Sequence, residues 1–176
     1  MLSKLYNSAK HPQEGFRYAQ EMAAVYLYQL EDAAEAVSII ENKCKNSTLD
    51  TSTIHYEAYY KLGDINGCLK VLRACLLNVD DDSTRSVVHY RIASLYEQQN
   101  NLQLAFENFE KSYKLNPSLL ESIEGMISTG LKLKNWTNVK DWLGVLASKV
   151  NSNLLANQLR TGLSRLEEGL KDVNVS

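Results

Sequence analysis

The spacing of apolar residues predicts pairs of amphipathic helices along most of this chain. The clearest pair lies in residues 86–119, where apolar or small side chains return every three or four positions. The first helix of this pair places Val88, Ile92, Leu95 and Tyr96 on one face, and the second places Leu104, Ala105, Phe109 and Ser112 on one face. A polar stretch at 98–101 separates the two runs, and Pro117 follows the second. This pattern predicts a helical hairpin.

The same segment resembles the tetratricopeptide (TPR) repeat, a helical hairpin of 34 residues with small and aromatic side chains at fixed positions. Seven positions match the family pattern: Ile92, Ala93, Tyr96, Ala105, Phe109, Ser112 and Pro117. Small residues at Ala93 and Ala105 let two helix backbones approach, and the rings of Tyr96 and Phe109 fill the space beside them. His89 stands where the family prefers tryptophan.

Weaker copies of the pattern flank this segment on both sides. Residues 120–153 continue in the same register, with Gly130 in place of the family tyrosine. Residues 49–82 contain a common local TPR motif, Tyr59, Gly63 and Asp64, followed by Cys68, Leu72 and Cys75 at packing positions. Residues 17–48 supply Leu27, Ala36 and Ile40. The resemblance therefore predicts about four repeats between residues 17 and 153.

Both ends of the chain predict further helical elements. Residues 1–16 are expected to form an N-terminal helix or partial repeat, without a cap for the apolar Leu2, Leu5 and Phe16. Leu155, Leu159, Leu163, Leu166 and Leu170 form one stripe, so residues 154–176 are expected to be a C-terminal capping helix and tail. The expected fold is all-α: a TPR-like right-handed α-solenoid of about four helix-turn-helix repeats (about 17–48, 49–82, 86–119 and 120–153) plus that capping helix.

Composition supports a helical fold and excludes several classes of protein. The 176 residues include only 8 glycines and 2 prolines, which is too few turn-forming residues for a many-stranded sheet. A net charge of −2 argues against nucleic acid as a partner. No apolar stretch approaches the ~20 residues that span a bilayer, and the N-terminus lacks a secretory apolar core. We expect no membrane insertion and a cytoplasmic location, with the nucleus as the alternative.

Catalytic and metal-binding patterns are absent from the sequence, so we expect no enzyme activity, cofactor or metal. There is no glycine-rich phosphate loop, no paired-histidine zinc motif and no nucleophile elbow. His55 and His89 lie 34 residues apart without a third ligand, and we interpret them as packing residues. Cys68 and Cys75 replace small packing residues, where a thiol behaves as a small hydrophobe. A helical enzyme with residues converging only in space is the rival hypothesis.

The TPR resemblance implies a concave groove lined by the first helix of each pair. The predicted partner-binding residues are Tyr18, Glu21, Tyr28, Glu57, Tyr60, Lys61, Tyr90, Glu97, Glu121 and Glu124. Tyrosine is enriched at recognition surfaces, and carboxylates favour a partner segment that carries Lys or Arg. The alternative is the ordinary polar face of amphipathic helices. The cationic clamp of TPR co-chaperones that hold heat-shock tails is missing, because its positions carry residues such as Glu21 and Val25.

The predicted function is protein–protein interaction, as an adaptor or as a subunit of a multiprotein assembly. One alternative is a small secretion chaperone, similar to the TPR class of bacterial type III secretion. The other is a homodimeric scaffold that uses the uncapped N-terminal end.

Overall fold

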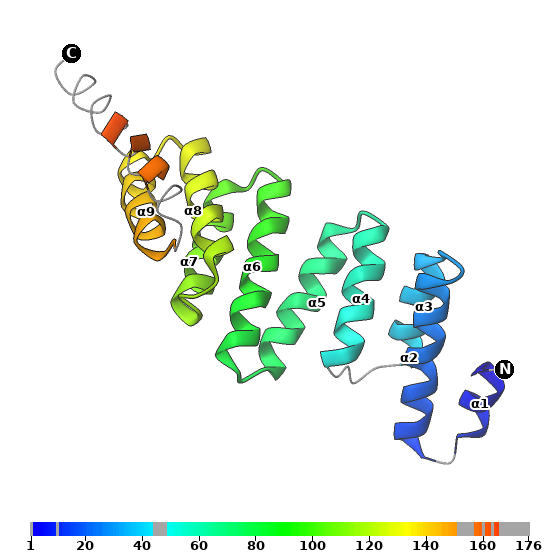
Figure 1. Ribbon diagram of the computed structural model, residues 1–176. Helices are drawn as coiled ribbons and strands as arrows, with labels where there is room; N and C mark the ends of the chain where they lie inside the picture. Colours follow the sequence, from blue (N-terminus) through cyan, green and yellow to red (C-terminus); the bar gives the residue numbers. More distant parts are fainter. Residues whose placement is uncertain are drawn as a thin grey trace. The chain divides into compact units, whose positions relative to one another are not determined.

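The computed structural model describes residues 2–9, 11–43, 49–150, 157–159, 161–162 and 164–165. Within these ranges every regular element is a helix (Figure 1). The helices are α1 (Leu2–Ser8), α2 (Pro12–Tyr28), α3 (Ala33–Lys43), α4 (Leu49–Lys61), α5 (Ile65–Asn78), α6 (Asp82–Gln98), α7 (Leu102–Leu115), α8 (Leu120–Lys132) and α9 (Trp136–Lys149). They pack in successive pairs, α2 with α3, α4 with α5, α6 with α7 and α8 with α9. The all-α prediction is confirmed.

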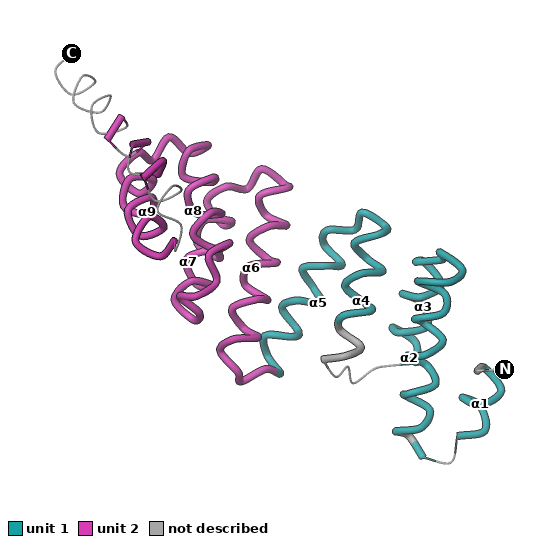
Figure 2. The backbone as a smooth tube through the Cα atoms, viewed as in Figure 1, with its two compact units in different colours: residues 1–78 teal, residues 79–176 magenta. Residues whose placement is uncertain are grey.

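The chain divides into two compact units, unit 1 (Met1–Asn78) and unit 2 (Val79–Ser176), which Figure 2 distinguishes by colour. In unit 1, α1 packs on α2, while α4 contacts both α3 and α2. In unit 2, α8 contacts α7, α9 and α6. Each unit therefore brings the first helices of two successive pairs into contact.

Each hairpin turn contains one residue in the left-handed backbone region. These residues are Glu31, Gly63, Asn100 and Lys134, with φ between 56° and 70°. The residue that follows each of them immediately precedes the second helix of its pair, at the N-cap position. Three of these following side chains accept a hydrogen bond from a backbone N–H three residues on, namely Asp32 from Glu35, Asp64 from Gly67 and Asn135 from Asn138. A left-handed residue followed by an N-cap thus ends one helix and starts the next.

One core cluster of unit 1 is built from small and aliphatic residues of α2, α3 and α4. Ala19, Ala23, Ala36 and Ala58 are fully buried, so these helices approach closely. Part of the predicted N-terminal segment lies against this core. Phe16 and Tyr6 pack against the core, and the Lys43 ammonium lies 4.0 Å from the centroid of the Tyr6 ring. Both rings are partly buried, and an N-terminal dimer surface stays a prediction.

The core of unit 2 centres on Phe109, which is 2% exposed. The predicted small residues Ala93 and Ala105 are fully buried beside it. Leu159 also packs on this core. It belongs to the predicted capping helix at 154–176, of which residues 157–159, 161–162 and 164–165 are helical and the others lie outside the described residues.

Two glycines bring a helix backbone directly against an aromatic ring. A Cβ atom added at Gly67 of α5 would lie 2.3 Å from the Tyr59 ring. A Cβ atom at Gly125 of α8 would lie 2.5 Å from the Phe109 ring. Neither distance is compatible with van der Waals contact, so at both positions only hydrogen fits without a shift of the ring.

Three buried serines connect α6, α7 and α8 by hydrogen bonds. Ser86 Oγ donates to the Ser112 carbonyl at 2.9 Å, and Ser112 Oγ lies 2.8 Å from the Ser86 carbonyl. Ser112 Oγ also lies 2.7 Å from Ser122 Oγ. Their hydroxyls are satisfied inside the core, as buried polar groups require.

Both packing histidines are partly buried in their own units. His55 stacks on Tyr59, with ring centroids 4.8 Å apart. His89 Nδ1 lies 3.1 Å from Asn108 Oδ1. Since the Asn108 amide donates to the Leu104 carbonyl, its oxygen faces the imidazole and Nδ1 is the donor. Among the described residues no group of three potential ligands gathers for a metal ion.

These histidines predict a loss of stability at mildly acidic pH. Burial, above all, lowers the pKa of His89 below its usual 6.5, and Lys111 and Arg85 lower it further against the Asn108 hydrogen bond. The unfolded chain therefore takes up the proton at higher pH, and the free energy of unfolding should fall from about pH 6.5 towards pH 5. Urea unfolding of unit 2, followed by tryptophan fluorescence, should show a smaller fall in His89→Gln. An equal pH dependence in both proteins would contradict this prediction.

Candidate interaction surface

In unit 1 the ends of α2 and α4 bring three predicted site residues together. The Tyr28 hydroxyl donates a hydrogen bond to the Glu57 carboxylate. Burial, then this hydrogen bond and the negative charge of Glu57, raise the pKa of Tyr28 to about 12, so the phenol stays protonated. Lys61 Nζ donates to the Leu27 carbonyl at 3.0 Å and lies 5.7 Å from the centroid of the Tyr28 ring.

The remaining predicted residues of unit 1 lie apart from these contacts. Tyr60 stacks on Tyr56, with ring centroids 6.0 Å apart, and its side chain is 52% exposed. Tyr18 is half-buried, and the Arg17 guanidinium lies 5.3 Å from the centroid of its ring. Glu21 forms an exposed ion pair with Arg17 at 3.7 Å. Glu21 is therefore engaged within its own helix.

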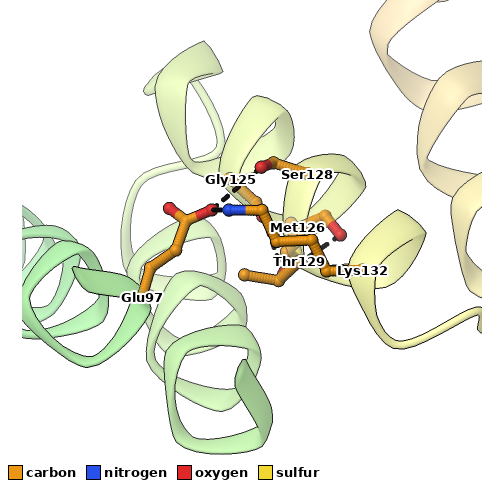
Figure 3. Close-up of polar contacts among 6 residues, drawn as sticks. All are labelled: Glu97, Gly125, Met126, Ser128, Thr129 and Lys132. Carbon is orange, nitrogen blue, oxygen red and sulfur yellow. Dashed lines mark hydrogen bonds and ion pairs between the residues drawn. The ribbon is translucent and has the colours of Figure 1, made fainter. Parts of the chain in front are cut away.

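In unit 2 a corresponding contact joins α6 to α8 (Figure 3). Glu97 Oε1 accepts a hydrogen bond from Lys132 Nζ at 2.6 Å and another from Ser128 Oγ at 2.9 Å. Thr129, next to Ser128, directs its hydroxyl back to the Gly125 carbonyl at 2.7 Å. Ser128 was not among the predicted site residues. Its place four residues before Lys132, on the same side of one helix, is the sequence signal that indicates it.

The other three predicted residues of unit 2 differ in their surroundings. Tyr90 is half-buried and packs on Phe109, with ring centroids 5.7 Å apart, so it helps to fill the core. Glu121 and Glu124 of α8 are exposed and form no hydrogen bond or ion pair with the residues that the structure describes. Glu121 and Glu124 remain available to a partner, whereas Glu57 and Glu97 are already bound within the chain.

We call the side on which α2 meets α4, or α6 meets α8, the first-helix face of each unit. Among the predicted site residues of these first helices, Tyr28 and Tyr60 in unit 1 have exposed rings. Glu121 and Glu124 in unit 2 have carboxylates without a partner among the described residues. Aromatic rings with a polar tip and carboxylates suit recognition of a polypeptide that carries apolar and basic side chains.

A family model matches the hairpin that the sequence pattern marks most clearly. The tetratricopeptide repeat model covers residues 87–119, which include most of α6 and all of α7. Residues 87–119 form a tetratricopeptide repeat. In this TPR, the positions that the family keeps small or aromatic are the tightly packed ones, with Ala93 and Ala105 fully buried and Phe109 at the centre.

Solved TPR-like structures resemble nearly the whole chain. One is a Podosopora anserina kinesin light chain, in which the TPR-like repeats are nearly identical to one another. Its sequence is 17% identical to this chain, the match covers 94% of this chain and 97% of that chain, and the TM-score is 0.58. MamA is 10% identical, with 97% of this chain and 87% of that chain covered and a TM-score of 0.60. Such low identity shows a shared fold alone. No curated protein matches the chain.

The TPR finding indicates a general role. TPR domains are generally protein–protein interaction modules and are typically non-catalytic, and the comparisons indicate no catalytic family. None of the helices that the structure describes is both long and apolar enough to cross a membrane.

Proposed function

We propose that this protein is an adaptor or assembly subunit that binds a segment of a partner protein along the first-helix face of its TPR-like pairs. The proposed contact residues are Tyr18, Glu21, Tyr28, Glu57, Tyr60, Lys61, Tyr90, Glu97, Glu121 and Glu124. Within this set, Tyr28 and Tyr60 supply apolar contact area, and Glu121 and Glu124 supply charge for Lys or Arg side chains.

The observation that carries this proposal is the state of the two tyrosine rings in unit 1. Tyr28 and Tyr60 are 51% and 52% exposed. Each ring is nevertheless held in place, Tyr28 by Glu57 and Lys61, and Tyr60 by stacking on Tyr56. A held but exposed aromatic ring loses little conformational entropy on binding, which is the property of side chains that contribute most to interfaces.

The test begins with the full chain as bait to identify a partner, followed by measurement of its affinity for two variants. Tyr60→Ala should weaken binding about tenfold, since truncation of an interface tyrosine costs more than 1 kcal/mol. Leu77→Ala is the matched control, because Leu77 is 87% exposed on α5 of the same unit. Both variants should retain wild-type stability.

Equal affinity of Tyr60→Ala and the wild type would contradict the proposal. Tyr90 is unsuitable for this test, because its ring packs on Phe109 and its removal would also disturb the core of unit 2.

A further inference from the structure

Unit 1 contains an open hollow where the turn between α2 and α3 meets the end of α4. It encloses about 620 Å³ and is lined by Glu31, Asp32, Ala33, Ala34, Lys61 and Leu62. We call it the turn-edge pocket. Its volume lies within the range of about 300–1,000 Å³ that is usual for ligand sites. The helices that frame it can be followed in Figure 1.

One exposed apolar side chain lines the turn-edge pocket, and two others belong to residues that adjoin or contact its lining. Leu62 lines it and is 48% exposed, and Leu30, which precedes Glu31 in the turn, is 60% exposed. Tyr28, over whose ring the Lys61 ammonium lies, is 51% exposed. Large apolar side chains gathered around a hollow are typical of docking sites.

The net charge of the lining of the turn-edge pocket is negative. The lining holds two carboxylates, Glu31 and Asp32, and one ammonium, Lys61, which donates to the Leu27 carbonyl and lies over the Tyr28 ring. Asp32 uses one carboxylate oxygen to cap α3, by accepting from the Glu35 N–H. The exposed Glu31 carboxylate forms no hydrogen bond or ion pair with the described part of the chain. A cationic group is therefore the complementary ligand.

We propose that the turn-edge pocket is a second docking site, which binds a short segment of a partner protein in which an apolar side chain neighbours Lys or Arg. The apolar side chain packs on Leu62, Ala34 and Leu30, and the cation pairs with Glu31 and Asp32. This site differs from the first-helix face, because four of its six lining residues belong to the turn after α2 and the start of α3.

The experiment is a titration of the isotope-labelled full chain with short acetylated peptides, followed by amide NMR shifts. The peptides carry Leu and Arg separated by zero to two residues, and the control peptides carry Glu in place of Arg. Peptides with Arg should shift the amides of residues 30–34 and 61–64 saturably, and the Glu peptides should not. Saturable shifts confined to other residues, or none at millimolar peptide, would overturn the proposal.

Two matched variants test the charge separately from the backbone. Glu31→Asn removes the carboxylate, and asparagine tolerates the left-handed conformation, so the turn is retained. Lys134→Asn places asparagine at the corresponding turn of unit 2, where φ is also 56°. We expect Glu31→Asn to weaken peptide binding about threefold, as for loss of an exposed ion pair, and Lys134→Asn to leave it unchanged.

The outcomes separate this site from the first-helix face and from self-association. Unchanged peptide affinity in Glu31→Asn would overturn the proposal. Amide shifts of residues 30–34 that depend on protein concentration in the absence of peptide would also overturn it, because they would show that a second copy of the chain occupies the pocket. Failure here leaves the effect of Tyr60→Ala on the captured partner as an independent test of the proposed function.

Discussion

Replacement of Phe109 by alanine is expected to lower the free energy of unfolding of unit 2 by about 3–5 kcal/mol. The ring is 2% exposed and lies among side chains of four helices, including Ala93, Ile123 and Leu146. Its face toward α8 meets the bare backbone at Gly125, which has no side chain to move into the space. The cavity left by alanine should therefore collapse poorly, which places the cost at the upper end of this range.

Tryptophan fluorescence during urea unfolding measures this effect on unit 2 directly. The chain has 2 tryptophans, Trp136 and Trp142, and both belong to unit 2. Leu104→Ala is the control on the same helix, because Leu104 is 36% exposed and should cost less than about 1 kcal/mol. A loss for Phe109→Ala no larger than that of the control would contradict the assignment of Phe109 as the centre of the core.

Gly67→Ala should destabilise unit 1 by about 1–2 kcal/mol, although alanine is the better helix former. The new methyl group would lie 2.3 Å from the Tyr59 ring. That ring has little freedom to move, since it is 8% exposed and its hydroxyl donates to the Glu41 carboxylate at 2.6 Å. The overpacking should outweigh the gain of about 1 kcal/mol in helix propensity. Far-UV circular dichroism of the full chain during unfolding, fitted with two transitions, is the measurement.

Gly144→Ala is the matched control for Gly67→Ala and should have the opposite sign. Gly144 lies within α9, and a Cβ atom added there meets nothing within 4 Å. Its replacement should stabilise unit 2 by about 0.5–1 kcal/mol. A Tyr59→Leu background should reduce the cost of Gly67→Ala, since the smaller side chain leaves room for the methyl group. Stabilisation by both glycine replacements would contradict the close approach.

The sequence predicts the helices and the core positions of this protein well, for a physical reason. Ala105, Phe109 and Ser112 of α7 recur at intervals set by the turn of a single helix, so a linear pattern contains them. Gly67 and Gly125 escape such reasoning. Each is defined by a ring that approaches from another helix, and no periodicity along its own helix indicates where that ring arrives.

Some contacts among the candidate site residues follow from the predicted register, and others do not. The register implied by the TPR resemblance placed Tyr28, Glu57 and Lys61 among the groove residues, and the structure brings them into contact. That register did not indicate that Lys132 would bind Glu97, because that pairing depends on how α8 lies against α6. Tyr90 was also predicted to line the groove, yet its ring packs on Phe109. The orientation of a half-buried ring depends on the space between helices, which the register along one helix does not give.

The chain of serine hydroxyls through Ser86, Ser112 and Ser122 has a consequence for alignment more than for strength. Alternating small side chains would allow α6, α7 and α8 to slide along one another with little loss of apolar contact. A displacement of one helical turn, however, would leave buried hydroxyls without partners. These three hydroxyls therefore fix the axial register of the neighbouring helices. That register sets the position along α6 and α8 at which Glu97 meets Lys132 and Ser128.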